Sequence, residues 1–369
     1  MRKRRVAHFI ESENPGGAET LLLEICSSLP EYGFSPIVLH FDDPYFIEQC
    51  HKLNIEQYTM PGRKYFKSWF KLWYFAFVLK NFIREKNIDI FHSHLFGPIT
   101  GAALGARLAG IPHIGTLHDV YMIEEKHLRI RILQLAALVG TKLVTVSKTM
   151  ENFYHDQAYF SPGAIRTIYN GVKIQNKYTT DTLSDLRSTL GLHPEDKVLI
   201  NVGRLVKLKR HDVLIQAVSR LNTDGNIKLL IVGSGPELTK IQELVSSLGL
   251  GNTVILTGQR DDVSQLLGMS DIYVQCSDTE GLSMSIMEAM AASLPCIVTD
   301  VGGNHELVID RENGWCVPPE DPDRLAEKIR ILLEDKNRRK RMGENSLKLV
   351  DRNFSFETTM KNYISMYNL

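Results

Sequence analysis

The chain alternates short apolar runs with longer amphipathic stretches along most of its 369 residues. The apolar runs, such as residues 6–10 and 197–202, have the length of buried strands. The stretches between them, such as residues 19–29, have the apolar spacing of helices that cover a sheet. This alternation predicts an α/β fold of doubly wound, Rossmann-like units with parallel sheets.

The length of the chain is too great for one ordinary core, so two domains are expected. A polar stretch, residues 173–185, interrupts the alternation and is interpreted as a linker. The predicted domains are residues 1–175 and 186–350, and residues 351–369 are predicted to form a C-terminal helix that packs back on the first domain. A ligand is expected in a central cleft, where the carboxyl ends of both sheets would face each other.

Charge and cysteine content limit the possible partners and location. The net charge is +0, which argues against binding to nucleic acid. Residues 1–180 carry 21 Lys and Arg against 16 Asp and Glu. This basic excess could face an anionic membrane or a phosphate-bearing acceptor, and chance explains it about as well. The five cysteines form no metal-like pair, and the longest apolar run, residues 72–79, is too short to span a membrane. We therefore expect a cytoplasmic protein with reduced thiols.

Residues 277–291 carry the most informative chemical pattern. Glu280 and Glu288 are separated by seven residues, and a helix is expected to begin at Leu282 or Ser283, with Ser283 as the N-cap. The free N–H groups and the positive end of this helix would then lie between the two carboxylates. An anion on the helix end and hydroxyl groups on the carboxylates would suit a nucleotide sugar.

Glycine loops and basic residues follow several predicted strands. Gly203, Arg204 and Lys209 follow residues 197–202, where both cations could reach one diphosphate, although a solvated basic loop explains them about as well. Gly233 follows the next strand, and Pro236 is expected at the first position of the helix after it. Similar loops surround residues 14–19 and 300–306. Together they favour phosphate binding more than any one loop does.

These motifs resemble those of the family 4 retaining glycosyltransferases (glycosyltransferase group 1), which have the GT-B architecture. The resemblance covers nearly the whole chain. It is carried by the sequences at 15–19, 116–119, 170–172, 203–209, 233–237, 280–288 and 302–306. The family usually has glycine after the phosphate-binding lysine, whereas Arg210 stands there in this chain. Arg210 would therefore either add a phosphate contact or crowd the loop.

The resemblance implies a role for each matching residue. Arg204 and Lys209 would bind the donor diphosphate and stabilise the leaving phosphate, and Glu288 would hold the ribose diol. Glu280 would contact hydroxyls of the transferred sugar, and His118 would lie near the reacting carbon. The residues implied as catalytic are His118, Arg204, Lys209 and Glu280. Those implied as donor-binding are Gly17, Gly203, Arg204, Lys209, Gly233, Glu280, Gly281, Leu282, Ser283 and Glu288.

The expected reaction is metal-independent transfer that retains the anomeric configuration. Cations and helix ends would stabilise charge on the departing diphosphate. No cofactor and no metal ligands are predicted, because the aspartates at 42–43, 261–262 and 321–323 resemble turn or helix-start residues. His92 and His94 are assigned structural roles. Hydrolysis by two carboxylates is the mechanistic rival. A hydrolysing nucleotide-sugar epimerase and a non-catalytic nucleotide-sugar-binding protein are the alternative functions.

The expected donor is a hexose or N-acetylhexosamine linked to UDP, with GDP as the alternative. The expected acceptor is a hydroxyl of a glycan or lipid-linked precursor in bacterial surface polysaccharide synthesis, with a small soluble acceptor as the alternative. A long helix is predicted over residues 65–86. The stretch around its start, residues 64–71, is basic and aromatic, as in a helix that contacts the anionic inner face of a membrane. Residues 72–79 are apolar on every side and are expected in the core.

Overall fold

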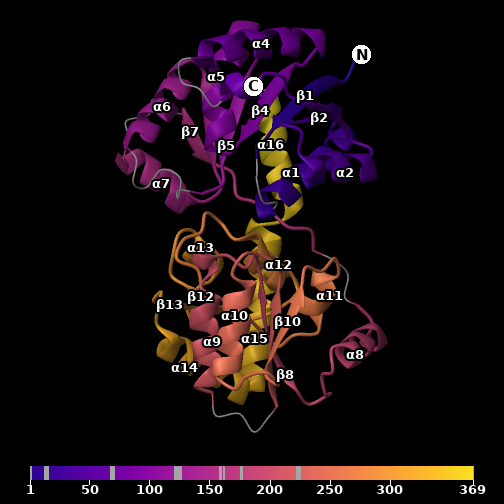
Figure 1. The fold of residues 1–369 in the computed structure, drawn as a ribbon, viewed down its shortest axis with the longest axis vertical. Helices are drawn as coiled ribbons and strands as arrows, with labels where there is room; N and C mark the ends of the chain where they lie inside the picture. The colour runs from indigo at the N-terminus through magenta and orange to yellow at the C-terminus, as the bar shows by residue number, and fades with distance from the viewer. Residues whose placement is uncertain are drawn as a thin grey trace. The chain divides into compact units, whose positions relative to one another are not determined.

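The computed structural model of the protein describes residues 2–11, 16–66, 71–119, 127–157, 160, 163–174, 178–221 and 226–368. The chain divides into two compact units. Unit 1 comprises Met1–Tyr169 and Met360–Leu369, and unit 2 comprises Asn170–Thr359. Figure 1 shows unit 1 in indigo to magenta, with the end of the chain in yellow, and unit 2 in pink to gold.

Unit 1 is built on a seven-stranded parallel sheet, within the part of the chain described, in the order β3-β2-β1-β4-β5-β6-β7. The strands are β1 (Arg4–Phe9), β2 (Phe34–His40), β3 (Glu56–Thr59), β4 (Ile90–His94), β5 (His113–Leu117), β6 (Thr141–Thr145) and β7 (Ile165–Thr167). The order reverses between β1 and β4, which places a topological switch point at their carboxyl ends. The side chains of Val6, Ala7 and Phe9 are fully buried, as expected of a strand covered on both faces.

Helices cover both faces of this sheet. They are α1 (Gly17–Ser28), η1 (Leu29–Tyr32), α2 (Pro44–Lys52), α3 (Arg63–Phe66), α4 (Leu72–Glu85), α5 (Phe96–Ala109), α6 (His127–Leu138) and α7 (Lys148–Gln157). The last helix, α16 (Phe356–Tyr367), begins in unit 2 and ends in unit 1. Its yellow end lies against the strands around β4 in Figure 1, and the Tyr367 hydroxyl is 2.7 Å from Nδ1 of His92.

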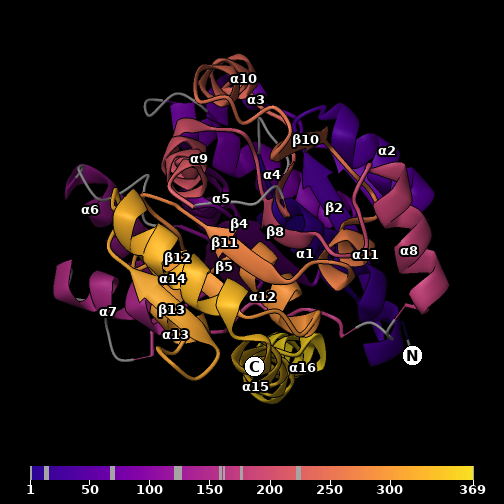
Figure 2. The ribbon, with the colours of Figure 1, turned by 90° about the horizontal axis from the view of Figure 1, so that it is seen from below.

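Unit 2 repeats this architecture with six described parallel strands in the order β10-β9-β8-β11-β12-β13. The strands are β8 (Lys197–Val202), β9 (Ile227–Val232), β10 (Val254–Gly258), β11 (Ile272–Gln275), β12 (Cys296–Thr299) and β13 (Gly314–Val317). The helical segments are α8 (Thr180–Thr189), η3 (Lys207–Lys209), α9 (His211–Ser219), α10 (Leu238–Ser247), α11 (Val263–Gly268), α12 (Met284–Ala291), α13 (Asn304–Leu307), α14 (Pro322–Glu334) and α15 (Lys336–Asn353). Figure 2 shows α8 beside α11 and α14 across β12 and β13.

The predicted fold class is confirmed, because both units are doubly wound parallel α/β structures. Three local predictions are wrong. The stretch interpreted as a linker contains the start of α8, which Thr179 caps by accepting a bond from the N–H of Thr182. Helix α10 begins at Leu238, two residues after Pro236. The segment predicted as one helix contains a short α3 and a separate α4, and residues 67–70 between them lie outside the described part.

The surface of α4 differs from the prediction that residues 72–79 are core. Phe75, Ala76 and Leu79 are buried, but Trp73, Tyr74 and Phe77 are 59%, 44% and 47% exposed. One face of α4 therefore packs on the sheet while the other presents aromatic rings. Among the described residues, no helix combines the length and apolar character needed to cross a bilayer. All five cysteines are free.

Candidate functional site

The carboxyl ends of β8 and β11 bring two predicted site residues into direct contact. The order of the sheet reverses between these strands, which is where doubly wound sheets bind ligands. Lys209 follows β8 and Glu280 follows β11, and Nζ of Lys209 donates to Oε1 of Glu280 at 2.5 Å. Their side chains are 21% and 11% exposed, so the pair is held in a partly covered site that still reaches solvent.

The Glu280 carboxylate is fixed through one of its two oxygens. Oε1 also accepts bonds from Nε2 of Gln275 at 2.7 Å and from Oγ of Ser277 at 2.6 Å. All the bonds that the described residues make to this carboxylate end on Oε1. The protein therefore orients the carboxylate while the second oxygen remains available to a ligand hydroxyl.

Gln275 is a site residue that the sequence did not reveal. It is buried at the end of β11, and its Oε1 accepts bonds from the hydroxyls of Tyr273, Ser283 and Ser285. Its amide thus joins Glu280 to the start of α12. A lone glutamine at the end of an apolar strand gives no signal in the sequence beyond being polar at a buried position.

Ser283 lies at the N-cap of α12 as predicted, but it does not cap the helix in the expected way. Its side chain makes no capping bond to the helix backbone. Its Oγ instead contacts Gln275 and Ser285 at 3.2 and 3.1 Å. The first N–H groups of α12 are therefore not bonded by the Ser283 hydroxyl, and helix ends of this kind attract anions.

Backbone contacts join the loops of this edge into one scaffold. The N–H of Asp278 donates to the carbonyl of Leu208 at 2.9 Å, and the N–H of Gly303 donates to the carbonyl of Gly281 at 3.1 Å. Gly302 has a φ of +53°, and a side chain there would collide with the Glu280 carbonyl. The position of Glu280 therefore depends on glycine in the loop after β12.

The predicted glycines after β8 and β9 lie against each other. Gly233 has a φ of +141°, and a Cβ at this position would collide with the carbonyl of Gly203. The N–H of Leu205 donates to the carbonyl of Ser234 at 2.8 Å, which closes the two loops together. Glycine is therefore required at Gly233 for packing of the loops, whatever ligand they hold.

Arg210, the departure from the family pattern, has the left-handed backbone conformation with φ +46° and ψ +47°. Such a conformation favours glycine, which explains the usual residue at this place. The guanidinium contacts three carboxylates, those of Asp212, Asp278 and Glu320. The hydrogen bond to Asp212 is the largest cause of the raised pKa of Arg210. Glu320 and Asp278 raise this pKa further, and desolvation opposes the change. The side chain thus connects the Lys209 loop to neighbouring loops, and its positive charge is paired with these carboxylates.

The remaining predicted residues of unit 2 lie on the same loops and on α12. Arg204 is exposed after β8, Gly281 and Leu282 are buried before α12, and Glu288 is half-buried within that helix. Burial chiefly, with smaller contributions from Cys296, Glu280 and Glu288, raises the pKa of Tyr273 well above its ordinary value. Both carboxylates therefore lie within electrostatic reach of one buried phenol.

Unit 1 places its predicted residues at the ends of β1 and β5. Gly17 is exposed at the first position of α1, and His118 is half-buried directly after β5. Nε2 of His118 is 3.2 Å from Nδ1 of His94, and Nε2 of His94 is 3.1 Å from Nδ1 of His8. The spacing of two residues between His92 and His94 could have indicated a shared face of a strand, but the sequence did not place His8 beside them.

Desolvation favours the neutral form of these histidines. Desolvation lowers the pKa of His118 to about 4 and that of His8 to about 3, and it lowers the pKa of His94 well below its ordinary value. Ring nitrogens of His8, His92 and His94 lie within 4.8 Å of one another, an arrangement with the ligand types of a metal site. One nitrogen of His8 and one of His94 are already used in the hydrogen bond between these two rings.

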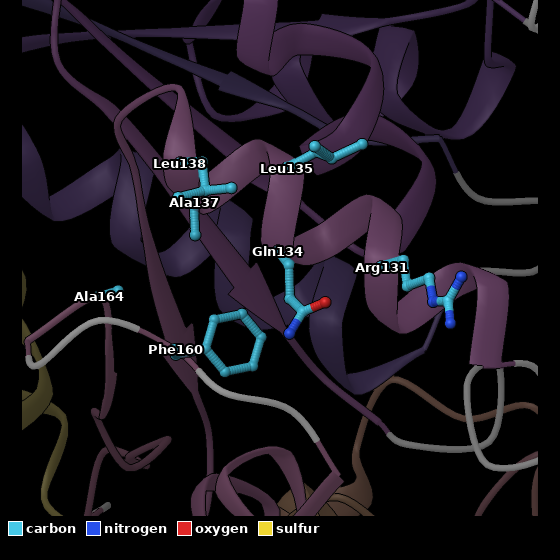
Figure 3. A pocket seen from close by; sticks show the side chains of 7 residues that line it. All are labelled: Arg131, Gln134, Leu135, Ala137, Leu138, Phe160 and Ala164. Atoms are coloured by element: carbon cyan, nitrogen blue, oxygen red, sulfur yellow. The ribbon is translucent and has the colours of Figure 1, made fainter.

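A separate pocket of about 380 Å³ lies beside α6 in unit 1. Figure 3 shows it between α6 and the segment with Phe160 and Ala164. Its lining residues are Arg131, Gln134, Leu135, Ala137, Leu138, Phe160 and Ala164. None of the predicted site residues is among them.

Known glycosyltransferase families match both units of the chain. The family described as "Glycosyltransferase Family 4" matches residues 15–176, and the family described as "Glycosyl transferases group 1" matches residues 184–349. An uncharacterised glycosyltransferase of Methanocaldococcus jannaschii is 32% identical over 78% of this chain and 77% of its own length.

Two further proteins cover almost the whole chain. One, from Campylobacter jejuni, is the N-acetylgalactosamine-N,N'-diacetylbacillosaminyl-diphospho-undecaprenol 4-alpha-N-acetylgalactosaminyltransferase, which is 26% identical over 91% of this chain and 92% of its own. The other is the crystal structure of Anabaena HepE in complex with UDP and glucose, with a TM-score of 0.87, 22% identity and 99% coverage of each chain. The second likeness establishes the shared fold.

Proposed function

The chain belongs to the group 1 glycosyltransferases of family 4, and we propose that it transfers a hexose or N-acetylhexosamine from a UDP-linked donor with retention of configuration and without a metal ion. The observation that carries the proposal is the Lys209–Glu280 contact at the switch point of unit 2. A cation for phosphate and an oriented carboxylate for hydroxyls stand side by side there. The UDP complex of HepE supports UDP as the nucleotide.

Lys209 and Arg204 are proposed to bind the donor diphosphate and to stabilise the charge that develops on it as the sugar–phosphate bond breaks. Lys209 itself donates to Glu280. The donor must therefore share Lys209 with Glu280 or draw it away. This exchange of partners would couple phosphate binding to release of the carboxylate toward the sugar.

Glu280 is proposed to accept hydroxyls of the transferred sugar through Oε2, since the bonds from the protein end on Oε1. The N–H groups at Gly281, Leu282 and Ser283 are proposed to contribute further donor contacts at the start of α12. Glu288 is proposed to hold the ribose diol, because a carboxylate accepts two adjacent hydroxyls. Gly203 and Gly233 allow the neighbouring loops to approach closely.

Two residues of unit 1 are also proposed to contact the substrates. His118 would contact the donor sugar near the reacting carbon. Gly17, at the exposed start of α1, would let the backbone approach the phosphate or the acceptor. The leaving phosphate would accept the proton of the attacking hydroxyl, so the acceptor would attack from the face that the phosphate leaves.

The proposed acceptor is a hydroxyl of a glycan or lipid-linked precursor in surface polysaccharide synthesis. The support is the name of the Campylobacter relative, which specifies a diphospho-undecaprenol substrate. Peripheral membrane contact is proposed for unit 1, through Lys64 and Lys71 together with the exposed rings of Trp73, Tyr74 and Phe77. Sedimentation with anionic vesicles tests this contact, and replacing the three rings with serine should reduce the bound fraction.

A thermal-shift screen of nucleotide sugars tests the function, because a bound donor raises apparent stability. The best donor is then incubated with glycan and polyprenyl diphosphate-linked acceptors, and the anomeric configuration of the product is read by NMR. We expect stabilisation by a UDP-sugar and a product with the donor's configuration. An inverted product, or no binding of any nucleotide sugar, would contradict the proposal.

A further inference from the structure

A chain of three imidazoles leads from inside unit 1 to His118. His8 is on β1 and His94 is on β4, and both are buried. The nitrogen pairs His8 Nδ1–His94 Nε2 and His94 Nδ1–His118 Nε2 are 3.1 and 3.2 Å apart. The rings of each pair are nearly parallel, with interplanar angles of 20° and 25° and centroids 5.3 and 5.5 Å apart. This separation is that of rings that meet edge to edge through their nitrogens, so each contact is a hydrogen bond between two imidazole rings.

The ring of His94 is itself held in place. His92 stacks on it with ring centroids 4.2 Å apart. The nitrogens of His92 contact the Tyr367 hydroxyl at 2.7 Å and the Thr116 hydroxyl at 2.8 Å. The orientation of His94, and through it that of His118, is thus fixed from β5 and from α16.

Neutral imidazoles allow only two arrangements of protons in this chain, because each ring has one N–H donor and one acceptor nitrogen. In the first arrangement His8, His94 and His118 all carry the proton on Nδ1. In the second they all carry it on Nε2. The lowered pKa values of the three rings keep them in the neutral form on which this count depends.

His8 decides between the two arrangements. Its Nε2 is buried and has no hydrogen-bond partner among the described residues. The second arrangement would place an N–H there without an acceptor, and buried N–H groups without a partner are rarer than buried acceptors without one. The first arrangement leaves only an unused acceptor, so it is the one favoured.

We propose that His94 and His8 are positioning residues that hold His118 as the neutral Nδ1–H tautomer. Nε2 of His118 accepts from His94, so Nδ1–H is the group left to donate to an oxygen of the ligand. This use of the tautomer rests on the proposed function of His118. A neutral donor suits that place, because a cationic ring would oppose the positive charge that develops on the sugar.

The tautomer is measured by long-range ¹H–¹⁵N correlation NMR on the full chain, labelled with ¹⁵N-histidine, at pH 7.5 with a chelator present. His118→Asn assigns the signals. We expect a protonated Nδ1 and an unprotonated Nε2 on His118, the reverse of the tautomer that a histidine side chain prefers in water. A protonated Nε2 on His118 in the wild-type protein overturns the proposal, whatever the variants do.

His94→Phe keeps a ring in the stack but breaks the chain. We expect His118 to revert toward the Nε2–H tautomer and kcat to fall about tenfold. The matched control is His113→Phe, which replaces a buried histidine on neighbouring β5 that bonds Ser93 and Thr141 outside this chain. An unchanged tautomer in His94→Phe refutes positioning by His94. Normal transfer by His118→Asn, with the predicted tautomer in the wild type, refutes only the proposed role of His118.

Discussion

Glu280→Gln should separate binding of the nucleotide from transfer of the sugar. Lys209 contacts Glu280 at 2.5 Å, so the substitution removes the negative partner of that ammonium group. The amide oxygen should take the place of Oε1, because Lys209, Gln275 and Ser277 all donate there. The NH₂ group then faces the ligand and donates where the carboxylate accepted.

The structure gives the direction and size of both effects. Freed from its ion pair, Lys209 should bind phosphate more strongly, and about 1 kcal/mol for a partly exposed pair corresponds to about fivefold tighter binding of UDP. Loss of a charged acceptor for a sugar hydroxyl should cost about 1.5 kcal/mol in the transition state, or about tenfold in kcat.

Calorimetric titration with UDP and steady-state kinetics with the best UDP-sugar measure the two effects. Glu288→Gln is the control, and it should not tighten the binding of UDP. If Glu280→Gln weakens UDP binding or leaves it unchanged, then Lys209 is not restrained by Glu280 or does not bind the phosphate. The exchange of partners would then be wrong.

Three further predictions concern the scaffold. Gly302→Ala should lower kcat at least tenfold with little loss of unit 1 stability, because the added side chain displaces the Glu280 carbonyl; normal kinetics would contradict this. Arg210→Gly should be more stable to urea than Arg210→Ala by about 1 kcal/mol, since alanine keeps the left-handed strain, and the reverse order would refute that reading. Unfolding at pH 5.5 should cost less free energy than at pH 7.5, by about 1.4 kcal/mol for each buried neutral histidine, because these groups bind protons once unfolded. Urea titrations at the two pH values measure this. A free energy of unfolding at pH 5.5 that equals or exceeds the value at pH 7.5 would show that the rings are charged when folded. The histidines whose pKa desolvation lowers are His8, His92, His94, His113, His118 and His211.

The alternation of strands and helices was enough to predict both sheets, because buried parallel strands leave apolar runs that stand out from the helices around them. Weakly apolar elements were missed. The residues of β3 are all partly or fully exposed, so its sequence lacks the apolar run of a buried strand. Helix α8 has no buried residue, which made its polar sequence look like a linker.

The site shows the same division between local and tertiary information. Lys209 and Glu280 were predicted because each follows a strand and matches a family motif. Gln275 and His8 were not predicted as site residues, because their importance comes from partners far away in sequence. Ser283 was placed correctly at the N-cap, but its hydroxyl turns to Gln275, which lies on another strand.

The central claim is that Lys209 binds the donor phosphate, and the dissociation constants of UDP and GDP test it most directly. Calorimetry should compare the wild type with Lys209→Met and with Lys207→Met, which changes an exposed lysine on the same turn, η3. We predict that the wild type binds UDP, that Lys209→Met binds it at least tenfold more weakly, and that Lys207→Met binds it normally. Equal affinity in wild type and Lys209→Met, or no binding of either nucleotide, would contradict the account.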